Sequence, residues 1–106
     1  MEQIPEIGPE DAKKQHRRRA ALFLDIRDPG SYAAGHIPGA LSLSDANVQQ
    51  VLSTTDKAQR IIIYCYHGNS SRGATAFFLE QGFESVSSMQ GGFEHWRGAY
   101  PDDVSS

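Results

Sequence analysis

The chain has 106 residues and a formal net charge of −3 at pH 7, with apolar residues at 39% and charged residues at 22%. This composition argues against disorder, and the acidic balance argues against general nucleic-acid binding, which depends on neutralising phosphates. The length suits one domain over residues 1–106 with a modest core, so we expect a shallow site open to solvent.

The first half of the chain alternates helical and strand signals. Pro9 follows Gly8 and precedes two acids, as at a helix start, and the polar helix should run to about Arg19. The further elements expected are a strand at 21–25, a turn at 28–30, a helical turn at 31–34 capped by Ser31, a strand at 40–43, and a weak helix at 44–52 capped by Ser44.

The first predicted helix carries a basic run, which comprises Lys13, Lys14, Arg17, Arg18 and Arg19. A helix that lies on a membrane surface needs bulky apolar residues opposite its charges. Around this run stand small or polar residues instead, such as Ala12, Gln15 and Ala20. We therefore expect a solvated helix face, and the role of the run stays open.

The second half of the chain holds the strongest strand signal. Residues 60–64 are β-branched and apolar on both faces, as in the buried centre of a parallel sheet. The elements expected after it are a polar loop at 65–70, a helix at 71–81, a strand at 83–88, a turn or helix after Gly91-Gly92, and a polar tail at 101–106.

Strands alternating with helices predict a small α/β domain with a mainly parallel sheet. Core positions are expected at Ala74, Phe77 and Phe78 on the long second-half helix, and at Phe93 and Trp96 near the end. In such folds the site lies beyond the carboxyl ends of the strands.

The sequence predicts a cytoplasmic protein without membrane insertion. No stretch approaches the length of a transmembrane helix, and Met1 is followed by Glu2 and Pro5 rather than by a basic and then an apolar segment. The single cysteine, Cys65, excludes an internal disulfide and a cysteine-based metal cage. Cys65 therefore serves packing or chemistry.

Cys65 directly follows the central predicted strand, and a helix is expected about six residues later. The positive end of that helix would point toward the sulfur and favour its thiolate. Gly68 and Asn69 most readily adopt left-handed dihedrals, so the loop can curl into a nest of backbone N–H groups that binds an anion. Further donors in the loop are the hydroxyls of Ser70 and Ser71 and, below neutral pH, the imidazole of His67.

A lone cysteine at the end of an apolar strand is often a small buried hydrophobe. The sequence Tyr66-His67-Gly68-Asn69-Ser70-Ser71 is a poor continuation for such a residue and a good cradle for an anion. The combination favours a catalytic cysteine over a packing one.

Arg72 falls in the first turn of the same predicted helix, where the helix dipole disfavours a cation. It is a candidate anion contact, or it pairs with an acid such as Asp25 or Asp28. A third interpretation, in which its side chain simply reaches solvent, stays open beside these two.

Three ordered motifs resemble the signatures of the rhodanese domain family, and they span roughly residues 21 to 97. The first is Leu24-Asp25-Ile26-Arg27-Asp28-Pro29, followed by Tyr32 and Gly35-His36-Ile37-Pro38-Gly39-Ala40. The second, Cys65 to Ser71, is similar to the active-site loop of the single-domain thiosulfate sulfurtransferases of this family. The third is Gly91-Gly92-Phe93-Glu94-His95-Trp96.

The resemblance implies a five-stranded parallel sheet flanked by helices and a two-step sulfur transfer. Cys65 would attack the outer sulfur of thiosulfate, release sulfite and become a persulfide. A persulfide carried on a protein or small thiol stays open as the alternative donor. A thiophilic acceptor, such as cyanide, a thiol or thioredoxin, would then take the sulfur. No metal or organic cofactor is implied. Asp25 and Arg27 would be supporting structural residues, as would His36 and the turn around it.

Two rival functions stay open. One is a binding or carrier module that holds persulfide sulfur without turnover. The other is a cysteine phosphatase or arsenate reductase on the same fold, whose longer loop places an arginine at the seventh position. Here Ser71 holds the seventh position and Arg72 follows it, so the loop is short for phosphate.

Overall fold

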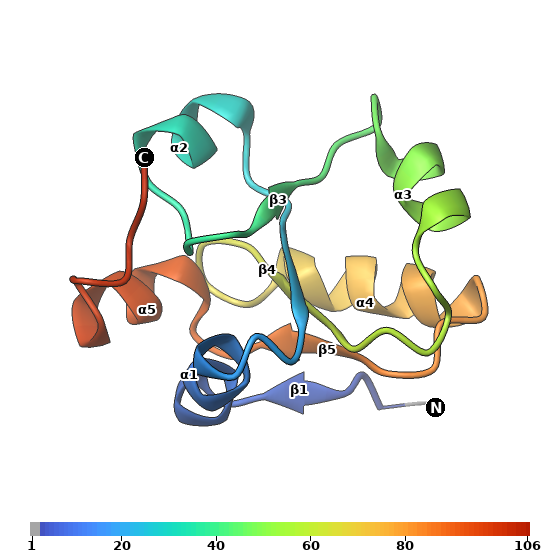
Figure 1. The fold of residues 1–106 in the computed structure, drawn as a ribbon, viewed down its shortest axis with the longest axis horizontal. Helices are drawn as coiled ribbons and strands as arrows, with labels where there is room; N and C mark the ends of the chain where they lie inside the picture. The colour runs from blue at the N-terminus through green and yellow to red at the C-terminus, as the bar shows by residue number, and fades with distance from the viewer. Residues whose placement is uncertain (1–2) are drawn as a thin grey trace.

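The computed structural model describes residues 3–106 and confirms the expected α/β fold (Figure 1). Within these residues, five parallel strands lie in the order β1-β5-β4-β2-β3. The strands are β1 (Glu6–Ile7), β2 (Leu22–Asp25), β3 (Leu41–Ser42), β4 (Ile61–Tyr64) and β5 (Val86–Met89). The helices are α1 (Pro9–Arg17), α2 (Pro29–Ala34), α3 (Val48–Thr54), α4 (Ser70–Glu80) and α5 (Gly92–Ala99).

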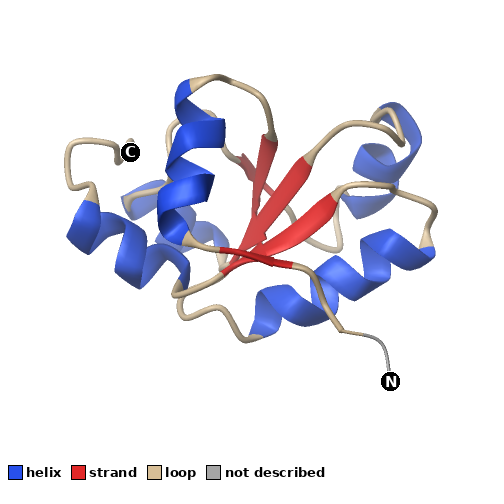
Figure 2. Ribbon diagram, turned by 90° about the horizontal axis from the view of Figure 1, so that it is seen from below, coloured by secondary structure: helices blue, strands red, loops and turns tan. Residues whose placement is uncertain are grey.

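Helices cover both faces of the sheet, as Figure 2 shows. Strand β4 divides the core because its side chains alternate between the faces. Ile62 and Tyr64 pack with residues of α1 and α5, among them the fully buried Trp96. Ile61 and Ile63 pack on the opposite face with residues of α3 and α4. All four residues of β4 are buried, in agreement with the sequence pattern.

Several sequence-based boundaries were wrong for local reasons. Helix α2 begins at Pro29, with Asp28 rather than Ser31 as its cap, because the Asp28 carboxylate accepts a hydrogen bond from the Ser31 N–H. Helix α3 begins at Val48 instead of after Ser44. The Asn47 side chain accepts a hydrogen bond from the Ser44 N–H, and this contact holds a turn before the helix. The two-residue strand β1 was not predicted.

The outermost positions also differ from the sequence interpretation. Phe77, expected in the core, is 38% exposed, whereas its neighbour Phe78 is buried. The segment predicted as a polar tail returns to the domain body: Ser105 and His36 exchange backbone hydrogen bonds, and the Asp103 carbonyl accepts one from the Trp96 indole at 2.9 Å. Figure 1 shows the C-terminus beside α2 accordingly.

Candidate active site

Cys65 is the first residue after β4, at the carboxyl edge of the sheet. Its strand lies between β5 and β2, so the thiol stands at the centre of that edge. Only 7% of the residue is exposed. The fold thus places the single thiol where parallel sheets commonly carry their sites.

The loop after Cys65 curls around the sulfur. The N–H groups of Gly68 and Ser71 lie 3.2 and 3.4 Å from Cys65 Sγ and donate to it. Gly68 has φ +93°, and an added Cβ would meet the Gly91 nitrogen at 3.1 Å, so a side chain is disfavoured here by dihedral and by space. Asn69 has φ −90° and does not share the left-handed conformation expected of it.

A buried pair of hydroxyls supports the sulfur. Ser71 Oγ lies 3.4 Å from Cys65 Sγ and 2.7 Å from Ser88 Oγ, and both serines are fully buried. When the sulfur is a thiolate, Ser71 donates to it and Ser88 donates to Ser71 in turn. Ser88 lies on β5 and was missed by sequence reasoning, because nothing in its own segment signals a contact with residues 17 positions away.

These contacts set the acidity of the thiol. Burial acts to raise the pKa of Cys65, but hydrogen bonds from the Ser71 hydroxyl and from the N–H groups of Ser71, Gly68 and His67 outweigh it, and the pKa is lowered. A lowered pKa increases the thiolate fraction at neutral pH, and the thiolate is the nucleophilic form of cysteine.

Backbone N–H groups at the N-terminus of α5 donate hydrogen bonds to the loop that begins at Cys65. The Phe93 N–H donates to the Cys65 carbonyl at 2.8 Å, and the Glu94 N–H donates to the Tyr66 carbonyl at 3.0 Å. Gly92 permits this approach: an added Cβ would lie 2.4 Å from the Tyr66 oxygen and 2.6 Å from the Cys65 oxygen. The double glycine before α5 is visible in the sequence, but its role in seating the loop is not.

Asp25 and Arg27 form a buried pair next to the loop. The two side chains are 0% and 2% exposed, and the Arg27 Nη2 atom donates to Asp25 at 2.7 Å and to the Gly35 carbonyl at 2.6 Å. Burial acts to lower the pKa of Arg27. The hydrogen bonds and charge of Asp25 outweigh burial, so the pKa of Arg27 is raised. The guanidinium lies 4.0 Å from the Phe93 ring centre and 5.0 Å from that of Tyr66.

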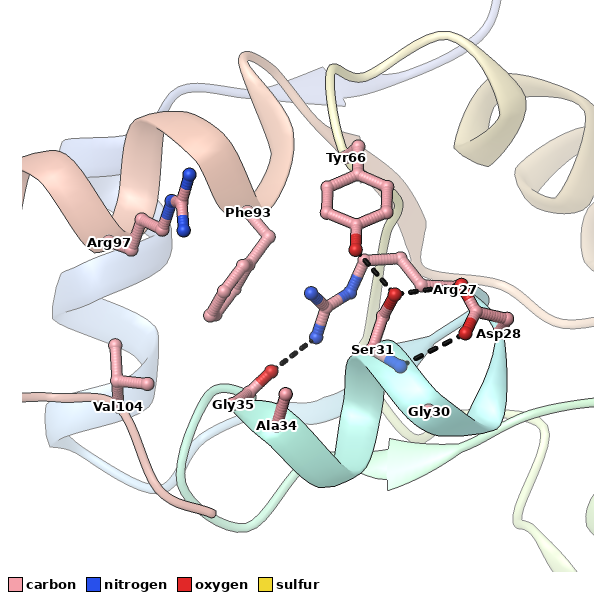
Figure 3. A pocket seen from close by; sticks show the side chains of 10 residues that line it. All are labelled: Arg27, Asp28, Gly30, Ser31, Ala34, Gly35, Tyr66, Phe93, Arg97 and Val104. Atoms are coloured by element: carbon pink, nitrogen blue, oxygen red, sulfur yellow. Dashed lines mark hydrogen bonds between the residues drawn. The ribbon is translucent and has the colours of Figure 1, made fainter.

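A pocket of about 400 Å³ opens beside Tyr66 (Figure 3). The Tyr66 hydroxyl bonds the Ser31 hydroxyl, which in turn donates to Asp28 at 2.7 Å. This chain of contacts ties the residue after Cys65 to the first turn of α2. Figure 3 also shows the Arg27 guanidinium between Tyr66 and Gly35, on the wall of this pocket.

The remaining predicted loop residues face solvent. His67, Asn69 and Ser70 are exposed. Of the interpretations left open for Arg72, pairing with Asp25 is not found, because Asp25 is bound by Arg27. Arg72 lies 4.0 Å from another acid, Glu6, with half of its side chain exposed. Over residues 3–106, no group of three or more histidine, cysteine, aspartate or glutamate residues is placed to hold a metal ion.

Fold and loop together define a parallel α/β domain that presents one acidified cysteine at the carboxyl edge of its sheet. The chain belongs to the rhodanese-like domain family, whose model matches residues 8–99. It is 46% identical over 100 residues to the thiosulfate sulfurtransferase GlpE of Pseudomonas aeruginosa in strains LESB58 and UCBPP-PA14, covering 94% of this chain and 90% of each relative.

Solved structures share the fold of this chain. The crystal structure of the Alr3790 protein from Anabaena sp. matches with a TM-score of 0.80 at 27% identity, over 89% of this chain and 78% of that one. The reduced Bacillus anthracis CoADR-RHD matches with a TM-score of 0.83 at 18% identity, over 97% of this chain and 18% of that one, which is a likeness of fold.

Proposed function

We propose that this protein is a thiosulfate sulfurtransferase in which Cys65 carries the transferred sulfur, with residues 1–106 acting as one domain. The observation that carries the proposal is the set of donors converging on Cys65 Sγ from Gly68 and Ser71. Family membership and the name of the GlpE relatives support the same reaction.

In the first step, the Cys65 thiolate attacks the outer sulfur of thiosulfate. The sulfur–sulfur bond of thiosulfate breaks, and sulfite leaves with its electron pair. Cys65 then bears a persulfide, whose negative charge lies on the outer sulfur, one bond beyond Sγ. The backbone donors of the loop contact Sγ, so they stabilise the thiolate that begins this step and that the second step restores.

In the second step, a thiophilic acceptor attacks the terminal sulfur of the persulfide. The bond to Cys65 breaks and the Cys65 thiolate is restored, so neither step requires an external oxidant, a metal or an organic cofactor. Cyanide would yield thiocyanate. In the cell we propose a thiol or dithiol such as thioredoxin as the acceptor, in the reducing cytoplasm, where a free nucleophilic thiol persists.

The outer part of the loop would receive the donor. Tyr66, His67, Asn69 and Ser70 are exposed around the sulfur and are proposed to contact thiosulfate as it approaches. Arg72 is the proposed anion contact, since its guanidinium is half exposed and its separation of 4.0 Å from Glu6 leaves it loosely held.

No helix among residues 3–106 is long and apolar enough to span a membrane.

Steady-state kinetics with thiosulfate and cyanide test the proposal. Parallel double-reciprocal lines are expected, because the two substrates react in separate half-reactions. Cys65→Ser should form no thiocyanate above the uncatalysed rate while keeping its fold by circular dichroism. Turnover retained in Cys65→Ser would disprove the role of Cys65, and single sulfur loading without turnover would identify a carrier instead.

A further inference from the structure

Three large hydrophobic side chains are exposed among residues 3–106: Leu41 at 41%, Tyr66 at 41% and Phe77 at 38%. Tyr66 follows the nucleophile directly. Phe77 lies on α4, six residues after Ser71, which contacts the sulfur; at 1.5 Å per residue this is about 9 Å along the helix axis. Tyr66 therefore lies beside Cys65 in the chain, and Phe77 lies less than two turns along α4 from the residue that contacts the sulfur.

Phe77 contributes to the wall of an open groove of about 670 Å³. The groove runs between α4, the start of α3 and the segments that follow β2 and β3. Its apolar lining residues besides Phe77 are Ile26, Pro29, Leu43, Val48, Ala74 and Phe78. Because the segments after β2 and β3 leave the carboxyl ends of these strands, the groove opens at the same edge of the sheet as Cys65.

The groove carries a net negative charge. Asp28 and Asp45 line it, and Asp45 is exposed with no ion-pair partner in the described part of the chain. Hydrogen bonds from the Ser31 hydroxyl and N–H lower the pKa of Asp28, which keeps it ionised. The cation in the lining, Arg27, is neutralised by Asp25. An occupant with an apolar side chain and an adjacent positive charge therefore complements the groove.

We propose that this groove docks the acceptor of the sulfur, and that the acceptor is a protein whose reactive cysteine is accompanied by an apolar side chain and a lysine or arginine. The inference rests on the proposed function and identifies its second substrate by class. Three residues of extended chain cover about 9 Å, which matches the axial separation of Phe77 from Ser71, so the test places the apolar residue three positions from the acceptor's cysteine. Cyanide is a small ion, so its reaction with the persulfide does not depend on contact with the groove.

Two synthetic octapeptides serve as acceptors. The first has a cysteine, a phenylalanine three positions away and a lysine beside the phenylalanine; the second replaces these two companions by serine and glutamate. The peptide thiolate attacks the outer sulfur of the Cys65 persulfide, which forms a peptide persulfide and releases the Cys65 thiolate. Mass spectrometry of the peptide gives kcat/KM, and thiocyanate formation is measured in parallel.

Each groove variant has a matched control. Phe77→Ser is compared with Leu41→Ser, because Leu41 is equally exposed but lies on the edge strand β3 outside the groove. Asp45→Lys is compared with Glu80→Lys, since Glu80 is also an exposed acid but stands at the far end of α4.

In the wild type, the first peptide should exceed the second at least tenfold in kcat/KM. Phe77→Ser and Asp45→Lys should remove most of this preference, both controls should keep it, and all four variants should match the wild type in thiocyanate formation. Equal kcat/KM for the two peptides, or equal losses in Phe77→Ser and Leu41→Ser, would overturn the docking groove. Absence of thiocyanate from the wild type would instead overturn the proposed function, and the docking inference with it.

Discussion

At the scale of single residues, the lowered pKa of the Cys65 thiol depends on partners from three parts of the chain. Gly68 and Ser71 donate backbone N–H groups from the loop and from α4, and Ser88 reaches the sulfur through the Ser71 hydroxyl from β5. The loop donors could be predicted because they lie within six residues of the cysteine. Ser88 could not, since its contact arises only when β5 pairs with β4.

Ser88→Ala should raise the pKa of Cys65. Without the Ser88 hydroxyl, Ser71 Oγ loses its buried partner and is less well oriented to donate to the thiolate. The rate of alkylation by iodoacetamide, measured against pH, follows the thiolate and should reach half its maximum at a pH below the usual pKa of a free cysteine thiol. The midpoint should move upward in Ser88→Ala.

Ser87→Ala is the control for this measurement, because Ser87 is the neighbouring residue on β5 and does not contact Ser71. Its alkylation midpoint should equal that of the wild type. An unchanged midpoint in Ser88→Ala would show that the second hydroxyl has no influence on the thiol.

Arg27→Met should destabilise the fold by about 3–5 kcal/mol, because it leaves the fully buried Asp25 carboxylate without its partner. Urea unfolding measures the loss. Arg97→Met removes the exposed pair with Glu94 and should cost less than about 1 kcal/mol. Equal losses in the two variants would contradict a special role for the buried pair.

At the scale of elements, the site depends on how closely α5 approaches the loop. The order of strands and helices could be predicted from hydrophobic periodicity, since β4 and α4 carry clear patterns. Strand β1 escaped prediction because two residues that include an exposed glutamate show no periodicity. The exposure of Phe77 depends on where α3 packs relative to α4. The sequence of α4 alone does not indicate this position.

Gly92→Ala should lower kcat/KM by roughly a hundredfold, because a methyl group 2.4 Å from the Tyr66 carbonyl must displace the loop, and small displacements of reacting groups are costly. Gly82→Ala is the matched control. Gly82 also has a positive φ, of 94°, but its Cβ would meet nothing within 4 Å. Both variants should lose some stability, and kinetics with thiosulfate should separate them; similar kcat/KM values would disprove the proposed seating of the loop.

At the scale of the whole molecule, the C-terminal segment closes the domain. Val104 packs against the core cluster that contains Trp96, and the Trp96 indole bonds the Asp103 carbonyl. Composition alone indicated a polar tail, because a single valine gives no hydrophobic periodicity. Backbone hydrogen bonds leave no pattern in the sequence.

Deletion of residues 101–106 should therefore destabilise the protein. The deletion removes the hydrogen bond of the Trp96 indole, the two backbone hydrogen bonds of His36 and the partial burial of Val104, which together amount to about 3 kcal/mol. For a chain of this size the melting temperature should fall on the order of 10 °C. A melting temperature equal to that of the full chain in differential scanning calorimetry would show that the segment contributes nothing.

Intact-protein mass spectrometry after incubation with excess thiosulfate tests most directly whether Cys65 carries the sulfur. The wild type should gain the mass of one sulfur atom, and cyanide should remove that mass with release of thiocyanate, while Cys65→Ser should gain nothing. No added mass on the wild type, or equal addition to Cys65→Ser, would contradict the account.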